Sequence, residues 1–330
     1  MPPFSDGARK PGAAHDAFAQ DFPSDLSADS LIHRARPSPR RGWRRTLFTL
    51  SRGRVNPGYS KAEVRLQELE AAIRGGAVSG SRRSIAVLGA QRGVGTSTTV
   101  LGLGALLAGK RGDRVVAVDA DPERSPLSNR GQVREQPQRP MGDLLYDTGA
   151  VLRYSQISNF VAQDASGLDV LPSSRDDTGG ALLSGPAYRR IADAVERFYS
   201  LLVVDAGSGV DRPAVPAILE RADQLVLVAH PSFEGANRAA TALDDIADLG
   251  GPELASSAII VLARSPRGHR SKLDDLERQL ARRCQQTVRV SRDGTLRSRN
   301  VVDPSRMGPK ALFGYLELAA GIVRAFNRRG

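Results

Sequence analysis

Short apolar runs alternate with amphipathic stretches along most of the chain after residue 80. The runs have the length and continuity of buried parallel strands, and the stretches between them have apolar residues at helical spacing. The predicted strands span 84–90, 114–121, 167–173, 200–207, 224–230 and 257–263, and the predicted helices run through 101–110, 186–198, 235–249 and 310–327. Strands that alternate with helices predict an α/β fold with a mostly parallel sheet and helices on both faces.

The chain before this pattern consists of an arm and a lead-in segment. Residues 1–58 are rich in Pro, Ser, Asp and Arg without periodicity, which predicts a disordered arm. Residues 59–80 are predicted to be a lead-in helix and linker, because Ser60 and Glu63 form a capping box before apolar residues at helical spacing. The remaining residues, 81–330, form the predicted domain.

Arginines and apolar residues are interleaved in one segment of the arm, RRGWRRTLFTL (40–50). A solvated arginine-rich linker is the favoured interpretation, because such tracts are common in disordered arms. The alternative is a short basic amphipathic helix that lies on anionic lipid or on an acidic partner.

Charge and composition limit the classes of function. Nine of the eleven net positive charges belong to residues 31–61, so the domain itself is nearly neutral, which disfavours nucleic acid as its partner. One cysteine and four scattered histidines exclude an internal disulfide and predict no Cys/His metal cage. The chain has no apolar run of membrane-spanning length and no signal-peptide pattern at its start, so a cytoplasmic protein is predicted.

The apolar stripe of the closing helix has two interpretations. Packing on the sheet is favoured, because the spacing is that of an ordinary core helix. A membrane-targeting helix is the alternative, since arginines flank the stripe. The stripe comprises Leu312, Leu316, Ala319, Ile322, Val323 and Phe326.

A glycine-rich turn joins the first predicted strand to the helix that follows it. Its free backbone N–H groups and the positive end of the helix suit an anion such as phosphate. The Ser97 hydroxyl is also a candidate ligand for Mg²⁺, with Thr98 as its alternative. The candidate nucleotide-binding residues are Gln91, Arg92, Gly93, Val94, Gly95, Thr96, Ser97 and Thr98.

This turn resembles the deviant Walker A motif of the MinD/ParA family, usually KGGVGKT, and the resemblance covers the whole predicted domain. Gly93, Val94 and Gly95 match the motif. Gln91 stands at the position of the family's signature lysine, and Thr96 stands at that of the P-loop lysine, so both family lysines are missing. The resemblance implies ATP and Mg²⁺ as cofactors, while the missing lysines leave hydrolysis, and with it enzyme activity, undecided.

Acidic residues follow two of the predicted strands, and the carboxyl ends of parallel strands meet at one edge of a sheet. The resemblance implies that Asp121 lies in switch I and orients the attacking water. It also implies that Asp205 begins the Walker B and switch II segment and holds Mg²⁺ through water. The candidate Mg²⁺ ligands are therefore Ser97, Asp119 and Asp205. The alternative is that the whole set is structural and binds no nucleotide.

Segments outside the turn narrow the resemblance to one branch of the family. They are GWRRTLFTLSRGRVNPGYSKAEVR, LAGKRGDRVVAVDADPERSPLSNR, ERADQLVLVAHPSFEGANRAATALDDI and YLELAAGIVRAF. They resemble the actinobacterial MinD-like proteins linked to type VII (ESX) secretion, the EspI-like group. This likeness implies a cytosolic accessory protein whose partner belongs to the secretion machinery. The turn GVGTST is also similar to that of the TadZ/CpaE pilus-assembly branch, which implies a localisation factor.

Three functions follow from these observations. The leading hypothesis is a nucleotide-binding switch or scaffold that forms a nucleotide-dependent homodimer, recruits a protein partner and hydrolyses ATP weakly or not at all. The second is an active ATPase in which Arg92 replaces the P-loop lysine, because a guanidinium binds phosphate oxygens. The third is a DNA-partitioning or polar-localisation factor. The basic arm adds a membrane surface as a further partner, which would place the protein at the inner face of the membrane.

Overall fold

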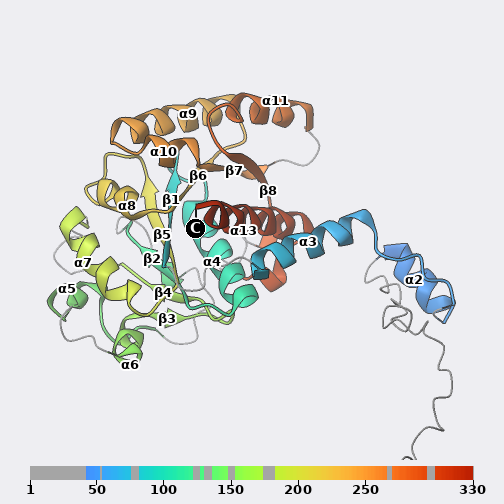
Figure 1. Ribbon diagram of the computed structural model, residues 1–330, viewed down its shortest axis with the longest axis horizontal. Coiled ribbons are helices and arrows are strands. Elements are labelled where there is room, and N and C mark those ends of the chain that lie inside the picture. Colours follow the sequence, from blue (N-terminus) through green and yellow to red (C-terminus); the bar gives the residue numbers. More distant parts are fainter. Residues whose placement is uncertain are drawn as a thin grey trace, which may run out of the picture. The chain divides into compact units, whose positions relative to one another are not determined.

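The computed structural model describes residues 42–52, 54–75, 82–121, 127–129, 136–147, 153–173, 183–265, 270–295 and 302–329 (Figure 1). It divides into two compact units, Met1–Glu63 and Val64–Gly330. The second unit contains the predicted α/β domain. The predicted disorder of residues 1–41 lies outside the described residues.

The first unit contains helix α2 (Gly42–Leu50), at the segment where arginines and apolar residues are interleaved. A helix is therefore present in this part of the predicted arm, and whether it is a solvated linker or binds lipid or a partner stays a prediction. Leu47 and Leu50 are 37% and 78% exposed, so α2 presents apolar side chains to solvent.

Helix α3 (Lys61–Gly75) begins behind the predicted capping box. The Ser60 N–H donates to Glu63 Oε2 at 2.8 Å, and the Glu63 N–H donates to Ser60 Oγ at 3.2 Å. Both bonds pair backbone N–H groups at the start of the helix, which have no hydrogen-bond partner within the helix itself. Leu69 and Ile73 are fully buried, so the later turns of α3 pack on the core of the second unit.

An eight-stranded sheet forms the centre of the second unit, in the order β3-β4-β2-β5-β1-β6-β7-β8 (Figure 1). Neighbouring strands are parallel except for β3 and β4, which confirms the predicted mostly parallel sheet. The strands are β1 (Arg83–Gly89), β2 (Val115–Asp119), β3 (Ala162–Gln163), β4 (Asp169–Leu171), β5 (Leu201–Ser208), β6 (Gln224–Ala229), β7 (Ile259–Ser265) and β8 (Gln286–Ser291).

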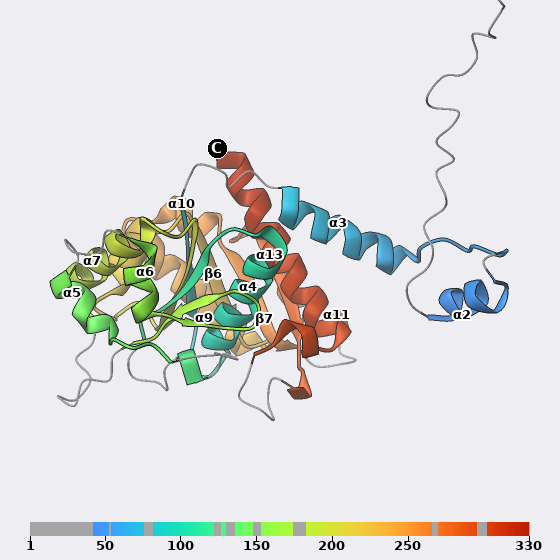
Figure 2. The ribbon, with the colours of Figure 1, turned by 90° about the horizontal axis from the view of Figure 1, so that it is seen from below.

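Alternate residues of the central strands face opposite layers of helices. In β1, Ile85 and Val87 belong to the apolar cluster that contains α3, α4 and α13, and Figure 2 shows these helices on one side of the sheet. Ala86 and Leu88 belong to the cluster that contains the remaining helices. Helices therefore cover both faces, as predicted. They are α4 (Thr96–Arg111), α5 (Leu144–Asp147), α6 (Tyr154–Ile157), α7 (Gly185–Glu196), α8 (Val215–Arg221), α9 (Phe233–Asp248), α10 (Pro252–Ser256), α11 (Arg270–Leu280) and α13 (Pro309–Arg329).

The closing helix α13 is part of the core. Leu316, Ile322, Val323 and Phe326 are at most 2% exposed and lie in the same apolar cluster as α4, which confirms the packed interpretation. Among the helices of the described residues, none combines the length and the apolar character that crossing a bilayer requires.

Deletion of residues 312–330 should therefore leave a chain that does not fold. Each large apolar side chain buried by α13 stabilises the protein by about 1.5–3 kcal/mol, and several together approach the roughly 5–15 kcal/mol of a whole domain. Circular dichroism and solubility of the purified chain measure the effect. A shorter deletion of residues 327–330, which keeps the buried stripe, should remain soluble and folded. A soluble, cooperatively folded product of the longer deletion would contradict the core role of α13.

Candidate functional site

The glycine-rich turn lies between β1 and α4, at the carboxyl edge of the sheet. Gly93 and Gly95 have φ angles of 78° and 109°, a region that L side chains rarely adopt. A Cβ added at either position would meet no atom within 4 Å, so the space beside the turn is open. Val94 is 4% exposed and anchors the turn in the core. The Thr99 N–H and hydroxyl both donate to the Gly95 carbonyl, at 2.9 and 3.0 Å.

The two turn residues that are predicted to replace lysines, Gln91 and Thr96, differ in their surroundings. Thr96 is 8% exposed, and its Oγ1 lies 2.5 Å from where a Cβ on Gly89 would stand, so its side chain folds back over the start of the turn. The Oε1 of Gln91 is buried without a hydrogen-bond partner among the described residues. Arg92, the residue between Gln91 and Gly93, is exposed. Neither Gln91 nor Thr96 carries a positive charge.

The carboxylates of Asp119 and Asp205 lie at the ends of adjacent strands. β2 and β5 are parallel, and these two residues are register partners. Asp119 accepts the N–H of Leu127 at 3.0 Å and the hydroxyl of Ser173 at 2.9 Å. Asp205 accepts the N–H of Gly207 at 3.1 Å. Both carboxylates are at most 2% exposed, so these neighbouring residues lie in a medium of low polarity.

Burial raises the pKa of both groups. Burial first, and then the negative charge of Asp119, raise the pKa of Asp205 to about 7, against a lowering hydrogen bond from the Ser97 hydroxyl. Burial likewise raises the pKa of Asp119 to about 6, although its hydrogen bonds lower it. The structure thus brings the three candidate Mg²⁺ ligands together at one point of the sheet edge.

These oxygens suit Mg²⁺ in kind. A divalent cation would relieve the repulsion between two buried carboxylates, and Mg²⁺ prefers carboxylate and hydroxyl oxygens. The described residues contain no group of three or more His, Cys, Asp or Glu side chains able to hold a metal by themselves. Such a site would have to be completed by water and phosphate oxygens, which is the usual arrangement for Mg²⁺ beside a nucleotide.

Asp121, the candidate for orienting water, is held by an arginine that the sequence did not single out. Arg212 Nη1 donates to Asp121 Oδ1 at 2.6 Å, and the two side chains are 11% and 3% exposed. Arg212 Nε also donates to the Ser208 carbonyl at 3.3 Å. Gly207 allows this approach, because a Cβ there would stand 2.7 Å from Asp121 Oδ2. The signal that could have pointed to Arg212 is its place directly after the strand that ends near Asp205.

The loop after β5 is also tied to the glycine-rich turn. The Gly209 N–H donates to the Gly89 carbonyl at 3.3 Å, and Gly89 is the register partner of Ser208. The segment that carries Arg212 and the segment that would hold phosphate therefore share one hydrogen-bonded boundary.

Helix α4 is supported at both ends. Near its start, the Tyr315 hydroxyl of α13 donates to the Thr98 carbonyl at 3.3 Å. Near its end, Lys110 Nζ lies 2.9 Å from Glu70 Oε1 of α3. The helix that begins at the glycine-rich turn is thus fixed by elements from both ends of the second unit.

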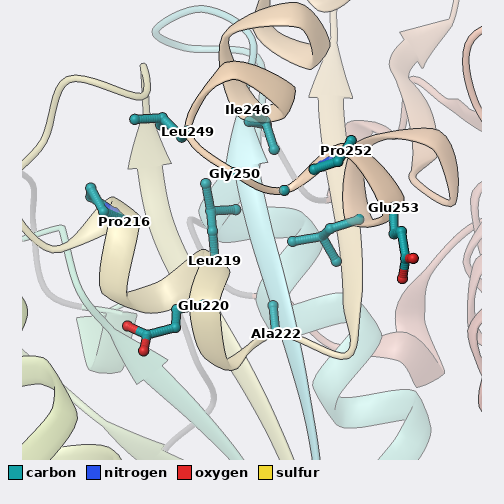
Figure 3. Close-up of a pocket in the computed structure, with 11 residues that line it drawn as sticks. Pro216, Leu219, Glu220, Ala222, Ile246, Leu249, Gly250, Pro252 and Glu253 are labelled. Atoms are coloured by element: carbon teal, nitrogen blue, oxygen red, sulfur yellow. The ribbon is translucent and has the colours of Figure 1, made fainter.

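A cavity of about 610 Å³ lies elsewhere, among α8, the end of α9 and the start of α10 (Figure 3). Pro216, Leu219, Ile246 and Leu249 contribute to its wall. These elements lead into the amino ends of β6 and β7, whereas the glycine-rich turn and the carboxylates lie at the carboxyl ends of the strands. The cavity contains none of the sequence-predicted site residues.

Known proteins are similar to this chain in sequence and in fold. A family model described as the CobQ/CobB/MinD/ParA nucleotide binding domain matches residues 85–300. The ESX-1 secretion-associated protein EspI of Mycobacterium tuberculosis is 32% identical over 293 residues, which cover 88% of this chain. The chain spans 43% of the length of EspI.

Two solved structures are similar at lower identity. A ParA family ATPase from Chlorobium tepidum superposes with a TM-score of 0.60 at 20% identity, over 72% of this chain and 99% of that one. MinD from Pyrococcus horikoshii, solved in complex with Mg-ADP, has a TM-score of 0.57 at 15% identity, over 76% and 99% of the two chains. At these identities the likeness shows the fold alone.

Proposed function

The chain belongs to the CobQ/CobB/MinD/ParA nucleotide-binding family, and from this membership we propose that it is an ATP- and Mg²⁺-binding switch or scaffold with weak or absent hydrolysis. One observation carries the proposal. The glycine-rich turn has Gly93 and Gly95 at positive φ, which suits a phosphate loop, while Gln91 and Thr96 stand where the family resemblance predicts two lysines. Backbone amides bind phosphate without side-chain charge, but stabilising the transition state of hydrolysis requires cations.

The residues of the carboxyl edge would divide the work of binding. The amides of the turn would cradle the phosphates, the Ser97 hydroxyl would ligate Mg²⁺, and Asp205 would hold it through water. Asp119 would accept from the same water shell. A Mg²⁺ ion held there would neutralise part of the phosphate charge. The support for these roles is the closeness of Ser97 to the buried pair of carboxylates.

The biological setting proposed here is an accessory role in type VII secretion. Its support is the 32% sequence identity to EspI, a protein that is named as ESX-1 secretion-associated. In this setting, a nucleotide-dependent homodimer would present a surface to a partner in the secretion machinery. Helix α2 would add an attachment to anionic lipid at the inner face of the membrane, because it carries exposed Leu47 and Leu50 beside Arg45.

Titration with a fluorescent ATP analogue tests the proposal, with and without Mg²⁺, together with phosphate release from the same sample. We expect binding that requires Mg²⁺ and release that stays near the protein-free baseline. Ser97→Ala should weaken the Mg²⁺-dependent binding, because it removes a ligand of the ion. Turnover that disappears in Arg92→Ala would instead establish the ATPase alternative, and a chain that binds no nucleotide would refute the proposal.

A further inference from the structure

The charge that the phosphate loop lacks has a second source in this structure. We infer that Arg212 supplies the positive charge for the terminal phosphate of a bound nucleotide, and that Asp121 holds its guanidinium until the nucleotide arrives. The inference rests on the proposed function, because it concerns how the same site binds nucleotide. It differs from the ATPase alternative, in which the exposed Arg92 takes this part.

The position of Arg212 favours a contact with the terminal phosphate. It lies on the loop that leaves β5, and that loop is hydrogen-bonded to the phosphate loop between Gly209 and Gly89. A Mg²⁺ ion held by Ser97 and Asp205 would draw the terminal phosphate toward Asp205. The loop that carries Arg212 leaves β5, the strand that contains Asp205, so it comes from the same side of the turn.

The burial of Arg212 also favours it over Arg92 as the phosphate-binding cation. Its side chain is 11% exposed, so most of the cost of desolvating and ordering the guanidinium has already been met in the folded protein. Arg92 is exposed, so its guanidinium would lose more hydration than that of Arg212 on binding a phosphate. A guanidinium also matches two phosphate oxygens at once, in the planar fork geometry that an ammonium lacks.

The negative charge of the surrounding carboxylates creates a need for cations at this edge. Asp119, Asp121 and Asp205 are each at most 3% exposed at this edge, and Arg212 donates to one of them. A polyphosphate that approaches three buried carboxylates needs compensating cations. Mg²⁺ can serve Asp119 and Asp205, and Arg212 can serve the phosphate once it leaves Asp121.

The exchange of partners would make the site bistable. The guanidinium donates to Asp121 at 2.6 Å in the observed state, and it would donate to phosphate in the other. Gly207 and Gly209, with φ angles of 74° and 88°, flank the segment at its start and allow it conformations closed to other residues. The Asp121–Arg212 pair is then the contact that ATP breaks and ADP leaves in place.

The test compares the affinities for ATP and ADP, both with Mg²⁺, by fluorescence or calorimetric titration. Arg212→Gln should weaken ATP binding by about 10- to 100-fold, as expected for the loss of charge-assisted hydrogen bonds, and should change ADP binding by less than about 3-fold. Asp121→Asn should strengthen ATP binding by about 3- to 10-fold, because the guanidinium loses its competing partner.

Two further variants distinguish the loss of the Arg212 charge from a general loss of structure. Arg212→Gln leaves Asp121 buried without that guanidinium, so the double variant Arg212→Gln/Asp121→Asn removes both charges and should restore the thermal midpoint while ATP binding stays weak. Arg221→Gln is the matched control, because Arg221 is also a partly buried arginine, 25% exposed and paired with Glu196 at 2.7 Å, but it lies at the amino edge of the sheet.

The outcomes distinguish a failure of the role of Arg212 from a failure of nucleotide binding itself. Equal losses of ATP and ADP affinity in Arg212→Gln, or no loss of either, would overturn the role of Arg212 while leaving nucleotide binding intact. A selective loss of ATP affinity in Arg92→Gln, with Arg212→Gln unaffected, would assign the charge to Arg92. A wild-type chain that binds neither nucleotide would overturn the proposed function and this inference with it.

Discussion

Thr96→Lys should raise the affinity of the chain for ATP by about 10- to 100-fold. Thr96 begins α4, and its Oγ1 already lies over Gly89, so a lysine stem has the same path along the start of the turn. Its ammonium would reach the phosphates, where a hydrogen bond between charged groups contributes about 1.5–3 kcal/mol. Addition of one correctly placed charge would thus supply what the backbone of the turn lacks.

Titration of the variant with ATP and Mg²⁺, at two salt concentrations, measures the gain. Thr241→Lys is the matched control, because it adds the same charge at an exposed position of α9. The control should bind ATP as the wild type does. An equal gain in both variants would show a general effect of net charge, and no gain in Thr96→Lys would show that the turn does not present phosphates to this position.

Asp205→Asn should stabilise the nucleotide-free protein at pH 8 and abolish its response to Mg²⁺. Burial raises the pKa of Asp205 to about 7 in the folded state from an ordinary value of 3.8, so the unfolded chain loses this proton first as the pH rises. Stability therefore falls between about pH 4 and pH 7, and the cost is complete above that range. Asparagine keeps an acceptor for the Gly207 N–H and removes the titrating charge.

Thermal unfolding at pH 4 and at pH 8, with and without Mg²⁺, checks this prediction. Each 1 kcal/mol gained corresponds to a rise of about 2–4 °C in Tm for a domain of this size. The rise should occur at pH 8 and nearly vanish at pH 4, and Mg²⁺ should raise the Tm of the wild type only. Asp244→Asn, at a side chain that is 63% exposed, should change neither quantity. A lower Tm of Asp205→Asn at pH 8 would mean that its charge stabilises the fold.

The central strands could be predicted because burial on both faces makes each a continuous apolar run. Strand β8 (Gln286–Ser291) was missed for the opposite reason, since it lies at the sheet edge and alternates buried Val288 and Val290 with partly exposed neighbours. Helix α11 (Arg270–Leu280) was missed because its charged residues outnumber the apolar positions that form its buried stripe. Periodicity thus identifies elements in proportion to the apolar surface they bury.

In the candidate site, residues at strand ends could likewise be predicted from the sequence, whereas a residue on a loop could not. Asp119 and Asp205 could be placed together from the sequence, because the ends of adjacent parallel strands meet at one edge. Arg212 could not be paired with Asp121, since 91 positions separate them and their contact depends on the path of a loop. Loop paths follow from tertiary packing, and no local pattern of residues encodes the partner of a given charge.

The packing of α3 determines where the domain can be cut. Ile73 supplies a carbonyl that accepts Arg111 Nη1 at 2.6 Å, and the Arg111 side chain is 4% exposed. A fragment that starts at residue 81 would therefore lose that acceptor, together with the apolar cover that Leu69 gives to the core. Fragments meant to retain the native fold should begin before residue 60, so that they keep the whole of α3 and the serine that caps it.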